Sequence, residues 1–281
     1  MKSIFIIFLL FYSNISFSQS SAFPQVSYTG GSGVISNYLR SQFQNDYTNA
    51  LLFAGMMLGE NTGLNDLKID IKDSNQANGQ AFVVERRIVI VVNQNLPDIS
   101  KIESFKASFF HEVGHHVISL YLRNASVIYK NFLESSKKMK DPAFRSDSAK
   151  FVEVSTLAFN LKKIVTPYEE LIADVFRVFF LQNPGGPLVS RDFSNLETND
   201  PSRFAKDEHT IFNPVRRALW EQFIQKNINN KAQLVILYRA LAKSIAEEID
   251  LQKNLIGQKQ VIDVLALNAQ LLNRIKFNLA R

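Results

Sequence analysis

Two histidines four residues apart, with a glutamate directly after the first, form the most informative stretch of the sequence. His111-Glu112-Val113-Gly114-His115 has the form HExxH, and it uses two of only four histidines in the chain. On a helix, residues four apart lie one turn above each other, so both imidazoles can point at one metal ion. Glu112 lies beside that face, where it can reach a metal-bound water. The motif predicts a zinc-binding helix; the alternative is a pair of buried structural histidines.

A catalytic zinc ion needs a third protein ligand, and an acidic pair further along the chain supplies a candidate. Such ions usually have three protein ligands and one open position. The chain has no cysteine. Glu170 and Asp174 are four residues apart in a helical pattern, so their carboxylates share one face. We assign Glu170 to the metal, and we assign Asp174 to a hydrogen bond that fixes the tautomer of a ligand imidazole.

The neighbouring Glu169 has a local explanation in the sequence. Thr166-Pro167-Tyr168-Glu169 has the form of a capping box, with proline at the first helical position. The pattern therefore predicts a helix that begins at Thr166 and ends near Gln182. In this interpretation Glu169 serves the start of the helix.

Together these motifs resemble those of the gluzincin metallopeptidases, which pair HExxH on one helix with ExxxD on a second. In this chain ELIAD, at 170–174, begins 55 residues after His115. The ExxAD form is similar to that of the CAAX prenyl proteases and HtpX-like heat-shock proteases. The phrase YEELIADVFRVFF also resembles the lethal-factor-like and Pro-Pro endopeptidase branch, so both branches stay open. The resemblance covers roughly residues 80–182.

The resemblance implies a zinc metallopeptidase with one zinc ion per chain, held by His111, His115 and Glu170. It implies that Glu112 is the catalytic base. It also implies that the strand near Arg87–Asn93 is the sheet edge along which a peptide substrate lies, as in binding by strand addition.

The remaining histidines differ in what they are expected to do. Several gluzincin families carry a later histidine followed by an arginine, and that histidine donates a hydrogen bond to the oxyanion of the reaction. His209 resembles it, although the arginines at 216 and 217 follow one or two residues later than in those families. Tyr168 is the alternative donor. His116 projects about 100° away from His115 on a helix, so we expect it to pack or face solvent and not to share the ion.

The pattern of apolar residues predicts an α+β fold built around this motif. Residues 34–58 have helical spacing, and residues 67–71 and 81–93 alternate like strands, the second stretch as a hairpin. An amphipathic helix over 104–122 then carries HExxH. Gly114 inside it suggests close approach of another segment, since glycine costs about 1 kcal/mol in a helix. The expected architecture is a small N-terminal antiparallel or mixed sheet with a zincin-type helix, followed by mostly helical residues to 281.

The N-terminus has the composition of an export signal. Lys2 precedes the apolar run Ile4–Phe11, and small residues at Ser16 and Ser18 predict cleavage before Gln19. We therefore expect a signal peptide over 1–18, a flexible lead-in over 19–33 and one metallopeptidase-like domain over 34–281. The protein is expected to be secreted or periplasmic, with no stable membrane span after cleavage.

The composition excludes several other classes of protein. Without cysteine there is no disulfide scaffold, thiol nucleophile or lipoprotein anchor. The net charge of +6 is dispersed over 281 residues, which does not indicate a nucleic-acid partner. The chain has no GxSxG, phosphate-binding loop or dinucleotide fingerprint. We expect peptides or proteins as substrates. The alternatives are a catalytically inactive zincin-fold binding or scaffold protein, and an exported helical protein without metal.

Overall fold

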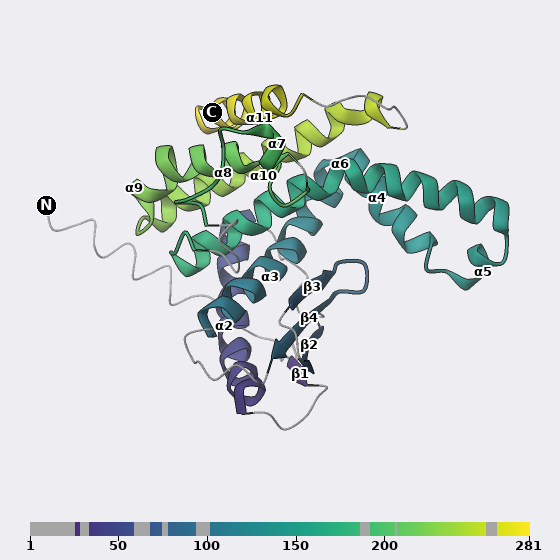
Figure 1. The fold of residues 1–281 in the computed structure, drawn as a ribbon, viewed down its shortest axis with the longest axis horizontal. Helices are drawn as coiled ribbons and strands as arrows, with labels where there is room; N and C mark the ends of the chain where they lie inside the picture. Colours follow the sequence, from purple (N-terminus) through teal and green to yellow (C-terminus); the bar gives the residue numbers. More distant parts are fainter. Residues whose placement is uncertain are drawn as a thin grey trace, which may run out of the picture.

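The computed structural model has an α+β fold, in which a small mixed sheet precedes a mostly helical remainder (Figure 1), and this confirms the predicted fold class. The structure describes residues 26–28, 34–58, 68–74, 78–93, 102–185, 192–205, 207–256 and 263–281. The strands are β1 (Val26–Tyr28), β2 (Lys68–Ser74), β3 (Asn78–Phe82) and β4 (Arg87–Asn93). The long helices are α2 (Val34–Leu58), α3 (Ile102–Ala125), α4 (Val127–Lys138), α6 (Ser148–Leu181), α10 (Lys231–Leu251) and α11 (Val264–Leu279).

Short helical segments connect the long helices. They are α5 (Pro142–Arg145), α7 (Pro201–Phe204), α8 (Asn213–Leu219), a π-helical turn (Trp220–Ile224), α9 (Gln225–Asn227) and a 3₁₀ turn (Gln252–Leu255). Among the described helices, none combines the length and the apolar character needed to cross a membrane. The predicted signal peptide, residues 1–18, lies outside the described residues.

The sheet has the strand order β1-β2-β4-β3. β1, β2 and β4 are parallel, and β3 is antiparallel to β4. The hairpin predicted within 81–93 is confirmed, because Phe82 of β3 is paired with Arg87 of β4. Its turn is closed by Arg86, whose φ of 49° lies in the left-handed region.

The predicted flexible lead-in is wrong for three of its residues. Val26–Tyr28 form β1, which pairs with β2 through Val26 opposite Ile69. Three residues are too few to show an alternating pattern, so only the partner strand identifies them as a strand.

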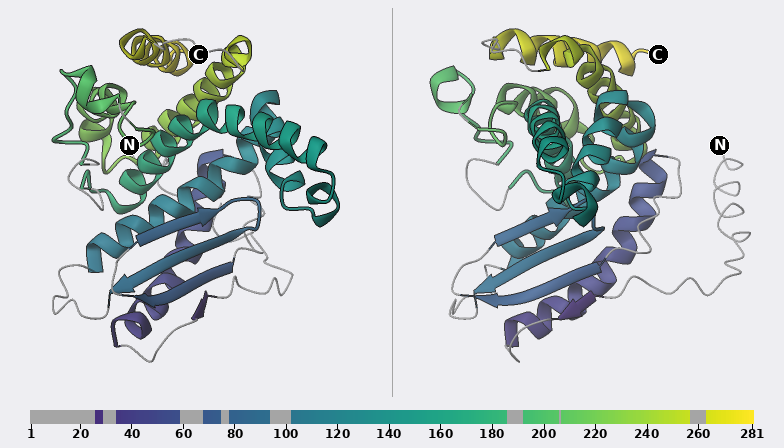
Figure 2. Two further views of the ribbon diagram at one scale, coloured as in Figure 1. Left: turned by 45° about the vertical axis from the view of Figure 1, so that its right-hand side comes forward. Right: turned by 90° about the vertical axis from the view of Figure 1, so that its right-hand side faces the viewer.

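Helices α2 and α3 cover one face of the sheet (Figure 2). That face carries Ile69, Ile71, Ile88 and Ile90, all completely buried. The register places Ile69 opposite Ile88 and Ile71 opposite Ile90, so the four side chains form one apolar patch. The sheet thereby supports α3, the helix that carries HExxH.

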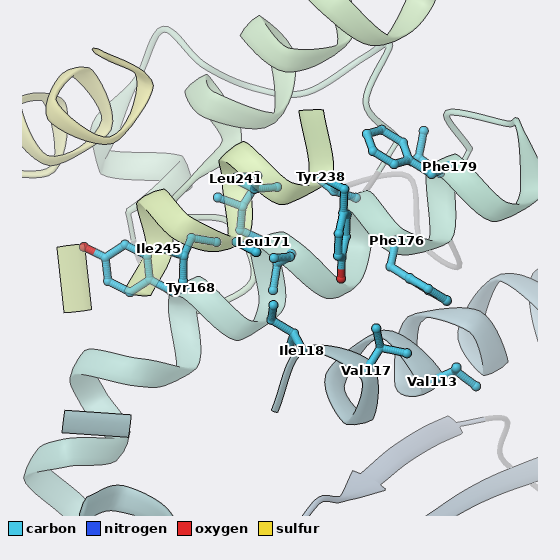
Figure 3. Packing of buried hydrophobic residues seen from close by; sticks show 14 of the residues in the cluster. Val113, Val117, Ile118, Tyr168, Leu171, Phe176, Phe179, Tyr238, Leu241 and Ile245 are labelled. Carbon is cyan, nitrogen blue, oxygen red and sulfur yellow. The ribbon is translucent and has the colours of Figure 1, made fainter. Parts of the chain in front are cut away.

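Three helices pack against one another on the far side of α3 from the sheet. Val113 and Val117 of α3, Phe176 of α6 and Tyr238 of α10 all lie in the core (Figure 3). The rings of Phe176 and Tyr238 are 6.2 Å apart and meet edge to face. α6 is therefore held between the metal-motif helix and α10.

The predicted start of a helix at Thr166 is wrong. α6 is one helix from Ser148 to Leu181, with Pro167 inside it. Proline there removes one backbone hydrogen bond and bends the helix, and Figure 3 shows the change of direction beside Tyr168. The first half of α6 packs against α4, and together with α5 they form a projecting helical arm, residues 127–165.

Candidate metal centre

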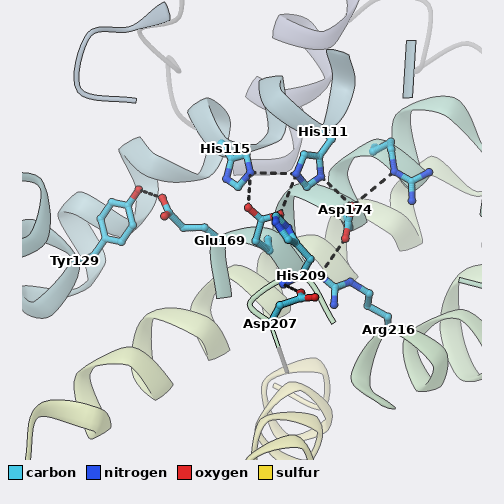
Figure 4. A network of polar contacts seen from close by, with 10 residues as sticks. His111, His115, Tyr129, Glu169, Asp174, Asp207, His209 and Arg216 are labelled. Carbon is cyan, nitrogen blue, oxygen red and sulfur yellow. Dashed lines mark hydrogen bonds and ion pairs between the residues drawn. The ribbon is translucent and has the colours of Figure 1, made fainter. Parts of the chain in front are cut away.

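The side chains of His111, His115 and Glu170 meet in the interior, as the sequence predicted. Both histidines project from α3 (Figure 4). Glu170 belongs to α6, which packs across α3. His111 Nε2 lies 3.2 Å from His115 Nε2 and 3.1 Å from Glu170 Oε2. His115 Nε2 lies 3.4 Å from Glu170 Oε1. All three residues are buried, and they form a group that could hold a metal ion.

The separations fit a tetrahedral ion. Zinc–nitrogen and zinc–oxygen bonds of about 2.0–2.1 Å at tetrahedral angles place ligand atoms roughly 3.3 Å apart. The two imidazole nitrogens lie 3.2 Å apart, close to that value. The Glu170 carboxylate faces both rings, with Oε2 3.1 Å from His111 Nε2 and Oε1 3.4 Å from His115 Nε2. The donor set of two imidazoles and one carboxylate is also one that zinc accepts in catalytic sites. The residues present therefore fit the group that the sequence predicted.

A close helix crossing brings the two ligand-bearing helices together. A Cβ atom on Gly114 would lie 2.8 Å from Cα of Ala173 on α6. Real Cβ atoms do not approach backbone that closely, so the crossing requires glycine at 114. The close approach expected from the sequence is confirmed, and its partner is the residue three positions after Glu170.

The three side chains of this group have complementary charges. Burial lowers the pKa of His115, but the nearby Glu170 carboxylate raises it more, to about 9. Burial raises the pKa of Glu170, and His115 and His111 more than reverse this, so the pKa of that carboxyl ends far below its usual range. For His111, Asp174 and Glu170 likewise outweigh burial and raise its pKa.

Asp174 lies behind His111, in the place the sequence predicted for it. Its Oδ1 is 2.8 Å from His111 Nδ1. When the proton of the imidazole is on Nδ1 and faces this carboxylate, Nε2 has a free lone pair that can bind a metal ion. The tautomer needed for metal binding is therefore set by Asp174.

Two buried arginines that the sequence analysis did not assign to the site surround Asp174. Arg216 of α8 has its Nη2 2.9 Å from Asp174 Oδ2, and Arg177 of α6 has its Nε 3.8 Å from Oδ1. All three side chains are completely buried. The sequence drew attention to Arg216 and Arg217 because they follow His209. It gave no indication that Arg216 pairs with Asp174.

His209 also reaches the group. It lies in the loop between α7 and α8, and its Nδ1 is 2.7 Å from Glu170 Oε2. The backbone N–H of His209 donates to Asp207 Oδ1, which holds the loop at this point (Figure 4). The side chain is 41% exposed, so the ring stands at the boundary between the buried ligands and solvent.

A cavity of about 1150 Å³ opens onto the group. Glu112, the predicted base, lines it together with the three ligands and His209. One wall is β3 and the turn after it, residues 80–85, and the opposite wall is the helical arm with Phe132, Leu133, Met139, Ala158 and Phe159. The cavity therefore combines the metal group with mixed polar and apolar walls.

The strand expected to form the substrate edge is not an edge. β4, residues Arg87–Asn93, is paired on both sides, with β2 and with β3. The strand at the cavity is β3, which is the outer strand of the sheet beyond β4. β4 has no free edge because the hairpin folds β3 back onto it.

Two other predicted neighbours of the site point elsewhere. Tyr168 is 2% exposed, packs against Phe212 in the core and does not line the cavity. His116, as expected, is not part of the ligand group among the described residues. Its Nε2 lies 3.2 Å from the carbonyl oxygen of Arg87, and burial lowers its pKa to about 3. Neutral His116 therefore donates to β4 and ties α3 to the sheet.

Glu169 has a different role from the one the sequence suggested. It lies mid-helix, is 7% exposed, and accepts a 2.5 Å hydrogen bond from the hydroxyl of Tyr129 on α4. It lines the cavity next to His115. Burial raises its pKa, an effect partly offset by His115 and by the Tyr129 hydroxyl. The capping-box interpretation hid this residue, because local sequence gave it a sufficient explanation.

Comparisons with models of known protein families, with curated proteins and with solved structures found no match. The interpretation of the site therefore rests on its own geometry.

Proposed function

We propose that this protein is a zinc-dependent metallopeptidase that hydrolyses peptide bonds. The observation that carries the proposal is the buried group of His111, His115 and Glu170, opening onto a cavity that Glu112 also lines. Zinc held by these three residues would supply a Lewis acid that makes a water molecule acidic near neutral pH and polarises a carbonyl group.

Glu112 would act as the general base. Glu112 stands between the two histidines in the sequence. Its side chain is mostly buried and lines the cavity. As water attacks the substrate carbonyl carbon, a carboxylate oxygen of Glu112 accepts its proton. The same carboxyl then donates that proton to the amine that leaves when the C–N bond breaks.

His209 would stabilise the charge that develops on the substrate oxygen. The support is its position at the mouth of the cavity: Nδ1 contacts Glu170 Oε2, so Nε2 is the ring nitrogen left to donate to a substrate oxygen, and the side chain is partly exposed. A hydrogen-bond donor held in advance at the developing negative charge lowers the barrier. Tyr168 is not proposed for this role, because it does not reach the cavity.

We also propose that the protein is exported, either secreted or periplasmic. The support is the sequence of residues 1–18, with one lysine, a short apolar run and small residues before Gln19.

The proposal is tested first by metal content. Purified residues 19–281 should contain one zinc ion per chain by elemental analysis, and Glu170→Ala should lose most of it. Glu153→Gln, which changes an exposed acid on the same helix, should keep it. Wild-type protein that folds but binds no zinc when zinc is supplied would contradict the proposal.

Activity separates an enzyme from an inactive binding protein. Zinc-loaded wild type should cleave a pool of unstructured peptides, followed by mass spectrometry. Glu112→Gln should retain zinc and lose at least about a hundredfold in rate, as expected for loss of a general base. A zinc-loaded wild type with no cleavage of any peptide would favour the binding-protein alternative.

A further inference from the structure

Glu169 is a buried carboxylate at the cavity that neither metal binding nor proton transfer uses, whereas Asp207 and Glu208, which also line the cavity, are exposed. Glu170 belongs to the ligand group, and Glu112 is the proposed base. Glu85, on the opposite wall, forms an ion pair with Lys140. Glu169 has no such cation, since among the described residues no lysine or arginine forms an ion pair with it. Lys162, which is exposed, also lines the cavity but forms no ion pair with Glu169 among the described residues.

The position of Glu169 is well defined. Its Oε1 accepts from the Tyr129 hydroxyl, which is itself completely buried. Glu169 immediately precedes Glu170 on α6. It therefore lines the cavity beside the metal group. Figure 4 shows its carboxylate between Tyr129 and His115.

Burying a carboxylate is costly unless its oxygens are compensated. The neutral phenol of Tyr129 gives Oε1 a hydrogen bond but no positive charge. A glutamine could accept the same bond without the cost of a charge, so the hydrogen bond alone does not account for an acid here. A cation entering from the cavity would give this carboxylate a charge-assisted hydrogen bond, and such bonds are the strong ones.

We propose that Glu169 forms a subsite beside the metal centre for a protonated nitrogen group of the peptide substrate. The group is either the side chain of a lysine or arginine next to the cleaved bond, or the α-amino group of the peptide. This inference rests on the proposed peptidase function, and it assigns to that function a basic substrate class. Tyr129 is the positioning residue that holds the carboxylate toward the cavity.

Binding can be tested without turnover. In a zinc-loaded Glu112→Gln background, peptides with a central lysine, arginine, glutamine, norleucine or glutamate, each with a free or acetylated N-terminus, are titrated by calorimetry. If the subsite binds a side chain, we expect peptides with lysine or arginine to bind at least about tenfold more tightly than those with glutamine or norleucine. If it binds the α-amino group, we expect the same advantage for peptides with a free N-terminus over acetylated peptides. Adding Glu169→Gln should remove that preference. Adding Glu85→Gln, an acid on the opposite wall, should leave it.

The acetylated series identifies the source of the cation. A preference that survives acetylation belongs to a basic side chain, and one that disappears belongs to the α-amino group. Zinc content and melting temperature measured on each variant separate loss of the subsite from loss of the fold.

Cleavage by the wild type is then measured with the same peptides. Cleavage with a basic preference that Glu169→Gln abolishes, while neutral peptides keep their kcat/KM, supports both proposals. Binding preference without any cleavage supports the subsite and contradicts the peptidase. Equal binding and cleavage of basic and neutral peptides, or a preference unchanged in Glu169→Gln, overturns the subsite and leaves the peptidase standing.

Discussion

At the residue scale, Asp174 connects the proposed metal ligand His111 to two buried arginines. Its Oδ1 lies 2.8 Å from His111 Nδ1 and 3.8 Å from Arg177 Nε, and its Oδ2 lies 2.9 Å from Arg216 Nη2. Charges buried this completely are tolerated only when they are paired. The same carboxylate therefore sets a ligand tautomer and neutralises guanidinium charge in the core.

We expect Asp174→Asn to destabilise the fold by about 3–5 kcal/mol, because it removes the charge of a buried carboxylate that is paired with both buried arginines. Zinc affinity should also fall about 10–100-fold, as is typical when the partner of a ligand histidine is lost. Urea unfolding and a competitive zinc titration measure the two effects. Glu153→Gln on the same helix is the control and should change neither; an Asp174→Asn protein of wild-type stability would show that this network does not stabilise the fold.

The Tyr129–Glu169 pair gives a second prediction at this scale. Tyr129→Phe keeps the ring in its buried place and removes only the hydroxyl that Glu169 accepts from. We expect a loss of about 1.5–3 kcal/mol in the free energy of unfolding, since a hydrogen bond to a charged group is removed. Chemical denaturation provides the measurement. Tyr238→Phe is the control and should change stability little, because this completely buried tyrosine does not line the cavity and its hydroxyl has no hydrogen-bond partner among the described residues. Equal stability of wild type and Tyr129→Phe would contradict the prediction.

At the scale of elements, the crossing of α3 and α6 determines whether the ligands meet. The crossing depends on Gly114, where an added Cβ would lie 2.8 Å from the backbone of Ala173. Because both helices are packed on their other sides, by the sheet and by α10, neither can move apart without disturbing the core.

Gly114→Ala is therefore expected to destabilise the protein by about 1–3 kcal/mol, the usual cost of overpacking. This outcome is opposite in sign to the gain of about 1 kcal/mol that alanine gives over glycine in an unconstrained helix. Gly185→Ala, where the nearest atoms belong to the exposed side chain of Asn183, should stay within about 0.5 kcal/mol. Thermal melting of both variants measures these changes. A Gly114→Ala variant with a higher melting temperature than the wild type would refute the close crossing.

At the scale of the whole molecule, the metal group is linked to the stability of the fold. The ligands come from α3 and α6, and the neighbouring His209 comes from a loop after residue 205. An ion that binds only this assembled arrangement stabilises the native state by mass action.

We therefore expect the melting temperature to rise with zinc concentration, with about 4 kcal/mol of stabilisation at a thousandfold excess over Kd. A chelator should reverse the shift. Glu170→Gln should show little or no zinc-dependent shift, while Glu153→Gln should respond like the wild type. Identical zinc responses in wild type and Glu170→Gln would exclude this group as the metal site.

The sequence identified the residues of the candidate metal centre better than it identified the segments around them. His111, His115, Glu170 and Asp174 were predicted because helical periodicity is local, and residues four apart share a face in any helix. The start of a helix at Thr166 was wrong because Pro167, which is favourable at a first turn, is also tolerated inside a helix when tertiary packing supports it. β1 and the identity of the edge strand were missed for a related reason, since pairing partners are not encoded locally.

By itself, the sequence determined the α+β class, the helix that carries HExxH, the shared face of Glu170 and Asp174, and the need for a close approach at Gly114. Each of these follows from the types and local spacing of residues. Only the tertiary structure decided that His209 reaches Glu170, that Tyr168 does not reach the cavity, that Arg216 and Arg177 surround Asp174, and that Glu169 faces the cavity. These facts join elements far apart in the chain, and which side chains meet there depends on how whole helices pack against one another.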